Sequence, residues 1–193
     1  MCRLFGLYAN RLVDVGFSFY RSPEKSFMEL SYDNPSGWGI AWLDKEGWHI
    51  YKGPQPLYLS DKARGLVEKR VRGRIIVSHI RLASVGNESL ENTHPWLYRG
   101  WVFAHNGTIY DRRALLELVD KKYRDFEGST DSEVFFHLIV QEAESLGDPV
   151  EGIMSAIEKI VAKGIGFSSL NFIASDGKRL YALRYATTSL DYY

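Results

Sequence analysis

The order of strand-like and helix-like segments is the feature that most limits what this chain can fold into. Strand-like segments cluster toward both ends, and most helix-like segments lie between them, without a strict strand–helix alternation. This order indicates an α+β fold of layered sheets and helices instead of a doubly wound parallel sheet. With 193 residues, 45% of them hydrophobic, the chain is long enough for one domain over 1–193 with a substantial core.

The clearest strand is the dense β-branched run within 74–82, which has the composition of a core strand. The pattern predicts further strands over 4–9, 38–43, 48–51, 101–105, 170–174 and 180–185. It predicts helices over 23–30, 60–70, 112–119, 131–143 and 150–161. Residues 84–98 have no clear period and are predicted to form a long functional loop.

Charge and composition exclude several classes of protein. Twenty-four basic residues balance twenty-four acidic ones, so nucleic acid and anionic membrane surfaces are not expected partners. No signal peptide or membrane-length apolar stretch appears, so we expect a soluble, cytoplasmic protein. The five histidines show no metal-ligand spacing and no phosphate-binding glycine loop is present, so neither a metal nor another cofactor is expected.

The only cysteine is the second residue, Cys2. Removal of Met1 would give Cys2 a free α-amine, which has an unperturbed pKa near ~8 and can take the thiol proton. Nucleophile and base would then share one residue. The alternative is a small buried hydrophobic side chain, which is the commoner role of a lone cysteine.

Three further segments carry groups suited to binding a polar substrate. Arg81 follows the strongest strand and could bind a carboxylate, although such an arginine is more often a surface group. Asn106 and Gly107 could donate hydrogen bonds to an oxyanion, or form a type I′ hairpin turn. Asp131 could receive an ammonium group. The neighbouring pattern is also explained by a helix capping box between Thr130 and Glu133.

Taken in order, Cys2, His-x-Arg-x-Ala-Ser, His-Asn-Gly-Thr-Ile and Ser-Thr-Asp-Ser-Glu resemble the class II glutamine amidotransferases, a family of N-terminal-nucleophile hydrolases. The resemblance implies a four-layer α-β-β-α sandwich with two mainly antiparallel sheets packed face to face. It also implies that Cys2 attacks the side-chain amide of glutamine, with Asn106 and Gly107 as the oxyanion hole. By the same similarity, Arg81 holds the substrate carboxylate and Asp131 its ammonium group.

Several positions depart from the family pattern. Leu82 and Val85 stand where biosynthetic members usually have tryptophan and histidine, while Ser84 replaces a threonine and keeps a hydroxyl group for substrate. His94 lies in a His-Pro loop expected to border the pocket, where it contacts substrate or shapes the loop. His79 and His105 precede motif residues on strands and are expected to be hydrogen-bonded core groups or to support the site residues from behind, instead of acting as ligands. Similar stand-alone members continue into another strand near 193, so this member is either short or lacks that strand.

The chain has no segment long enough to be an acceptor domain, and it resembles most closely the stand-alone amidotransferase-like branch, which includes γ-glutamyl hydrolases. The expected activity is therefore hydrolysis of glutamine or a γ-glutamyl compound through a Cys2 thioester. Two alternatives are an ammonia-donating subunit of a two-chain synthase and an inactive metabolite-binding scaffold. A protein partner that carries an acceptor domain, or a second copy of this chain in a homo-oligomer, is compatible with the sequence.

Overall fold

The protein is described by a computed structural model over residues 2–82 and 89–187. Its first sheet, sheet A, has the strand order β1-β4-β2-β3, and every neighbouring pair is antiparallel. The strands are β1 (Arg3–Val13), β2 (Trp38–Leu43), β3 (Trp48–Gly53) and β4 (Gly73–Ile80). β4 lies in the interior of the sheet, as its run of β-branched residues predicts.

The second sheet, sheet B, is also antiparallel and has the order β5-β6-β7-β8. Its strands are β5 (Trp96–Tyr98), β6 (Trp101–Asn106), β7 (Asn171–Ser175) and β8 (Leu180–Leu183). Three helices cover its outer face: α2 (Arg112–Leu116), α3 (Asp131–Leu146) and α4 (Pro149–Ala162). Helix α1 (Asp61–Lys69) covers the outer face of sheet A.

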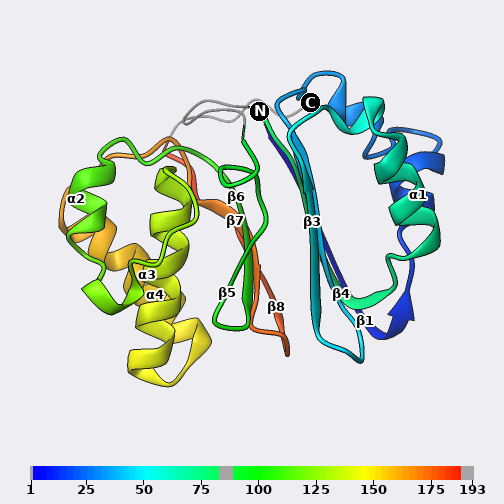
Figure 1. Ribbon diagram of the computed structural model, residues 1–193. Coiled ribbons are helices and arrows are strands. Elements are labelled where there is room, and N and C mark those ends of the chain that lie inside the picture. The colour runs from blue at the N-terminus through cyan, green and yellow to red at the C-terminus, as the bar shows by residue number, and fades with distance from the viewer. Residues whose placement is uncertain (1, 83–88, 188–193) are drawn as a thin grey trace.

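Figure 1 shows the resulting four layers, with the two sheets face to face and helices outside both. Each layer boundary has its own apolar core. The fully buried residues between the sheets are small, Ala41 and Val77 from sheet A with Val102 and Ala104 from sheet B, and larger, partly buried side chains pack around them. Small side chains let the two sheets approach closely, so residues at one end of this interface can meet across it.

The α+β class and the sandwich architecture expected from the sequence are confirmed. All seven predicted strands are present within a few residues of their expected bounds, and so are four of the five predicted helices. One strand was missed, because residues 84–98 include β5, which pairs with β6.

The helix predicted over 23–30 is wrong. A π-helical turn, η1 (Phe17–Arg21), ends before this range, and a 3₁₀ turn, η2 (Glu29–Ser31), begins only at its end. The Oγ of Ser26 accepts a hydrogen bond from the Glu29 N–H at 3.2 Å, and the Glu29 carboxylate accepts from the Ser26 N–H at 2.7 Å. Reciprocal capping therefore starts a short turn at Ser26 instead of a helix at Pro23.

Two further 3₁₀ turns connect the main elements, η3 (Leu57–Leu59) and η4 (Lys121–Tyr123). Within the residues that the structure describes, no helix has both the length and the apolar character needed to span a bilayer.

Candidate active site

Cys2 immediately precedes β1 and faces the space between the two sheets. The pairing of Arg3 with Ile80 brings Cys2 beside the end of β4. Its Sγ lies 3.2 Å from the backbone nitrogen of Leu82, which donates a hydrogen bond, and 3.4 Å from the Leu82 carbonyl oxygen. The thiol is therefore held by the backbone of the residue that follows Arg81.

Burial raises the pKa of the Cys2 thiol. The hydrogen bond from the Leu82 N–H and the charge of Arg81 act in the opposite direction but are smaller influences. A thiol whose neutral form is favoured needs a base to become a nucleophile. Among the described residues, no histidine or carboxylate is hydrogen-bonded to this sulfur.

Arg81 lies on the same side of the site as Cys2 and is almost fully buried. Its backbone is fixed by the loop before β2, since the Arg81 N–H donates to the Gly37 carbonyl at 2.8 Å and the Ser36 N–H donates to the Arg81 carbonyl at 3.0 Å. Gly37 has φ +118°, a conformation that favours glycine. The arginine therefore stands on a rigid strand end.

Asn106 and Gly107 approach from sheet B, at the end of β6. The Asn106 Nδ2 donates a hydrogen bond to the carbonyl oxygen of Cys2 at 2.9 Å. A Cβ at Gly107 would lie only 1.9 Å from the carbonyl oxygen of Ser169, so no other residue fits without a backbone shift. The hairpin turn weighed for this pair is wrong, because β6 pairs with β5 and β7 and the chain continues toward α2.

Asp131 is the first residue of α3 and is buried. Its Oδ2 accepts a hydrogen bond from the Ile109 N–H at 2.7 Å. Burial raises the pKa of the Asp131 carboxyl, while hydrogen bonds from the Ile109, Asp131 and Ser132 N–H groups act to lower it. A carboxylate that is costly to bury is expected to gain from a cationic partner in the cavity.

The capping box predicted before α3 is only half formed. The Oγ1 of Thr130 accepts from the Glu133 N–H at 3.3 Å, as a cap should. The Glu133 carboxylate does not return to Thr130. It accepts instead from the Glu127 N–H at 2.6 Å and the Gly128 N–H at 2.8 Å. The carboxylate therefore orders the loop that leads into Asp131.

Three buried histidines, His79, His94 and His105, lie next to the groups described above. His79 is on β4, two residues before Arg81, and its ring stacks on that of His94 with centroids 4.2 Å apart. The Nδ1 of His94 accepts from the His105 N–H at 3.1 Å. The His105 ring contacts the Ser132 Oγ at 2.9 Å and the Ser169 carbonyl at 3.2 Å. Burial lowers the pKa of His79 to about 3 and of His105 to about 4, and lowers that of His94 as well.

A cavity of about 30 Å³ lies at the centre of these groups. Its lining includes the predicted residues Cys2, Arg81, His94, Gly107 and Asp131. The described residues leave room there for about two water molecules. Asn106 is not among the lining residues, but it contacts the site through its hydrogen bond to the Cys2 carbonyl. Ser84 lies outside the described residues.

The sequence analysis did not assign His79 to the site, although it lines the cavity. Strand alternation could have indicated this, because residues two apart on a strand share a face and Arg81 had already been chosen. His105 is the hydrogen-bonded core group that was expected, whereas His79 has no such partner among the described residues.

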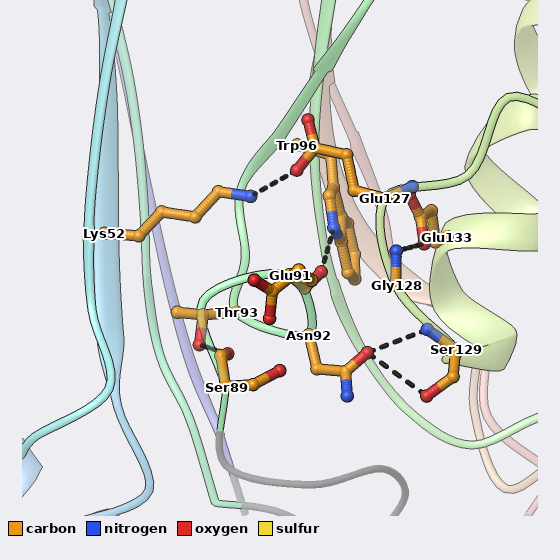
Figure 2. Close-up of polar contacts among 10 residues, drawn as sticks. All are labelled: Lys52, Ser89, Glu91, Asn92, Thr93, Trp96, Glu127, Gly128, Ser129 and Glu133. Atoms are coloured by element: carbon orange, nitrogen blue, oxygen red, sulfur yellow. Dashed lines mark hydrogen bonds and ion pairs between the residues drawn. The ribbon is translucent and has the colours of Figure 1, made fainter.

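A polar network connects the segment before β5 to the loop that leads into α3 (Figure 2). The Oδ1 of the buried Asn92 accepts from the Ser129 N–H at 2.9 Å and lies 3.4 Å from the Ser129 Oγ. A Cβ at Gly128 would be 2.5 Å from that same oxygen. From β3, the Lys52 ammonium reaches the Glu127 carboxylate at 3.3 Å. The network therefore joins the segment before β5 to the loop before α3, and the Lys52–Glu127 ion pair ties that loop to sheet A.

No group of three or more potential metal ligands is arranged around a common point in 2–82 and 89–187.

Comparison with known families gives one consistent result. A family profile described as class-II glutamine amidotransferases matches residues 1–192. A protein named YafJ from Escherichia coli (strain K12) is 31% identical over 202 residues, which cover 98% of this chain and 74% of YafJ. The amidophosphoribosyltransferase of Methanocaldococcus jannaschii is 28% identical over 83% of this chain and 34% of its own length.

Solved structures agree on the fold. The glutamine phosphoribosylpyrophosphate amidotransferase of B. subtilis superposes with a TM-score of 0.72 over 95% of this chain, at 20% identity and over 37% of its own length. A glutamine aminotransferase class-II domain protein from Silicibacter pomeroyi gives a TM-score of 0.68 over 97% of this chain, at 24% identity and over 79% of its own length. Two other curated relatives are covered to only 65% and 51% of their length.

Proposed function

This chain belongs to the class II glutamine amidotransferases, and we propose that it hydrolyses the γ-amide of glutamine or of a γ-glutamyl compound through a thioester on Cys2. The observation that carries the proposal is that Cys2, Arg81, Gly107 and Asp131, from four separate segments, line one cavity. These groups match a substrate with a carboxylate, an ammonium group and an amide carbonyl.

Binding of the glutamyl group uses charges of opposite sign. The Arg81 guanidinium pairs with the substrate α-carboxylate, and the Asp131 carboxylate pairs with the α-ammonium. The Asp131 carboxylate, whose burial is costly, gains a cationic partner in this way. With the two charged ends fixed, the side-chain amide is held against the thiol in a reactive orientation.

The chemical step starts with removal of the thiol proton by the α-amine of Cys2, once Met1 has been removed. The raised pKa of the thiol makes this base necessary. The sulfur attacks the amide carbon, and the oxyanion receives hydrogen bonds from the Gly107 N–H and the Asn106 carboxamide, whose other N–H donates to Cys2. The same proton then passes to the leaving nitrogen, and water releases glutamate from the thioester.

A specific observation supports the alternative in which ammonia passes to an acceptor protein. The chain spans only 34% of the M. jannaschii amidophosphoribosyltransferase, whose name states a transfer reaction. In that case the purified chain hydrolyses glutamine slowly and a copurifying partner accelerates the reaction. We place the protein in the cytoplasm, where glutamine is available, with a glutamyl compound as its small-molecule partner.

Covalent labelling tests the proposal directly. Mature protein is incubated with a diazoketone analogue of glutamine and analysed by intact mass and peptide mapping. We expect one adduct on Cys2, no adduct in Cys2→Ala, and protection by glutamine. A labelled Cys2→Ala variant, or active protein that retains Met1, would contradict the mechanism. Parallel assays with glutamine, glutathione and other γ-glutamyl amides then identify the leaving group.

A further inference from the structure

One group of the proposed substrate has no assigned partner in the cavity. The carboxylate, the ammonium group and the carbonyl oxygen are matched by Arg81, Asp131 and the pair Asn106–Gly107. The nitrogen of the scissile amide, which leaves as ammonia or as an amine, is unmatched. This inference rests on the proposed function and concerns that nitrogen.

One lining side chain is likewise unmatched. His79 is fully buried, and within residues 2–82 and 89–187 neither of its ring nitrogens has a hydrogen-bond partner. Buried polar groups without partners are rare in proteins and usually indicate a bound water or ligand. The other cavity histidines do have partners, since His94 accepts from the His105 N–H and the His105 ring contacts Ser132 and Ser169.

The strand register places His79 close to the reacting sulfur. His79 pairs with Leu4 across β1 and β4, and Cys2 lies two residues before Leu4. Cys2 and His79 are therefore diagonal neighbours on the same face, at a distance of roughly 7–8 Å between Cα atoms. Both line the 30 Å³ cavity, and a small molecule between them can contact each.

The histidine pair is suited to an uncharged nitrogen compound. Burial keeps His79 and His94 neutral at physiological pH, so neither ring repels or protonates an amine. A neutral imidazole offers one acceptor and one donor. Because His94 Nδ1 accepts a hydrogen bond, its proton is on Nε2, and this tautomer is set by the His105 backbone.

We propose that His79, backed by His94, forms an amine subsite that accepts a hydrogen bond from the nitrogen leaving the glutamyl carbonyl. As the S–C bond forms and the C–N bond breaks, the thiol proton goes through the α-amine to that nitrogen, which leaves as NH3 or RNH2. The imidazole only holds the nitrogen and loses no proton. In reverse, the same subsite holds an uncharged amine that attacks the thioester.

Competition between water and hydroxylamine for the thioester tests this subsite. Water gives glutamate and hydroxylamine gives γ-glutamyl hydroxamate, each with return of the thiol. The ratio of the two products is measured for wild type, His79→Leu and His79→Asn, together with the rate at which the diazoketone labels Cys2. His137→Leu is the matched control, because His137 is also buried but does not line the cavity.

We expect His79→Leu to lower the hydroxamate-to-glutamate ratio roughly 5- to 10-fold, the effect of one lost hydrogen bond, while Cys2 labelling changes less than about 2-fold. His79→Asn keeps a donor and an acceptor and should restore most of the ratio. His137→Leu should leave it unchanged.

An unchanged ratio in a His79→Leu protein that still labels at Cys2 would overturn the subsite. Equal loss of labelling and of both products in His79→Leu and His79→Asn would also overturn it, since His79 would then only support the fold. Failure of wild-type protein to label or to hydrolyse glutamine would instead contradict the proposed function itself.

Discussion

The two sides of the cavity are built in different ways. On the sheet A side, Cys2, His79 and Arg81 are positioned by the register of β1 against β4, and the strand backbone sets their spacing. On the sheet B side, Gly107 and Asp131 are positioned by close packing and by hydrogen bonds from side chains to loops and helix ends. Substitutions on the sheet A side should therefore remove a functional group and leave the backbone in place. Substitutions on the sheet B side should also shift the backbone around the cavity.

The largest effect is expected on the sheet B side, from Gly107→Ala. The added methyl group would overlap the Ser169 carbonyl and crowd the His105 ring, so the backbone must shift at the proposed oxyanion hole. We expect glutamine hydrolysis to fall about 1,000-fold or more, with a lower melting temperature. Gly65→Ala is the control, because it adds a methyl group in α1 where no atom lies within 4 Å. Near-normal activity of Gly107→Ala would show that this side is less tightly constrained than described.

Acid should lower the free energy of unfolding, because both sides of the cavity contain histidines that burial keeps neutral. His79, His94 and His105 have pKa values lowered by burial, so below about pH 6.5 the unfolded chain binds protons that the folded protein does not. Stability therefore rises with pH across this range and is lost as the pH falls. We expect the free energy of unfolding in urea to drop by about 4 kcal/mol between pH 7.5 and 5.5, about 1.4 kcal/mol for each of the three histidines.

Replacement of His79 by asparagine separates its share of this effect. His79→Asn should reduce the drop by roughly 1 kcal/mol, because one titrating group is gone. An equal free energy of unfolding at both pH values in wild type would mean that the three histidines are not kept neutral by burial.

Asp131→Asn should separate stability from function on the sheet B side. The raised pKa of Asp131 means that its ionised form destabilises the folded protein at neutral pH, and this cost is absent only at pH values low enough to protonate it. Asparagine can still accept from the Ile109 N–H. We expect unchanged or higher stability in urea, with kcat/KM for glutamine reduced roughly 10- to 100-fold. A loss of stability with normal kcat/KM would assign Asp131 to the helix cap alone.

The smallest effect is expected from Asn92, which joins two segments of the sheet B side, the one before β5 and the one before α3. Its carboxamide holds Ser129, two residues before Asp131, so its loss should weaken recognition of the substrate ammonium group. The readout is the preference for glutamine over 4-carbamoylbutanoate, which lacks that group. Asn92→Leu should lower this preference about 5-fold, and Asn92→Asp, which keeps the accepting oxygen, should retain most of it. An equal loss with both substrates would indicate a structural role only.

The sequence was sufficient for much of the fold because the relevant signals are local. The apolar run of β4 and the spacing in α3 and α4 define those elements directly. In contrast, β5 was missed because a three-residue strand is defined by its pairing with β6, which no local pattern contains. The helix expected at Pro23 failed because reciprocal capping by Ser26 and Glu29 competes with it.

The order of the motifs predicted the residues of the candidate site. The spacing of these residues in the sequence could not show that they line one cavity. Arg81 and Asp131 are fifty residues apart in the chain and meet only through the packing of two sheets. The sequence places His79 in the core or behind the site residues, because a histidine in a strand gives no sign of whether its ring has a partner. Only the assembled structure shows that it has none among the described residues.

The hydrogen bond from Asn106 to the Cys2 carbonyl joins the start of the chain to the opposite layer of the sandwich. Because the bond spans the gap between the sheets, the position of Cys2 relative to Gly107 depends on how the two sheets pack against each other. Substitutions in the small core between the sheets can therefore shift the nucleophile without touching the cavity.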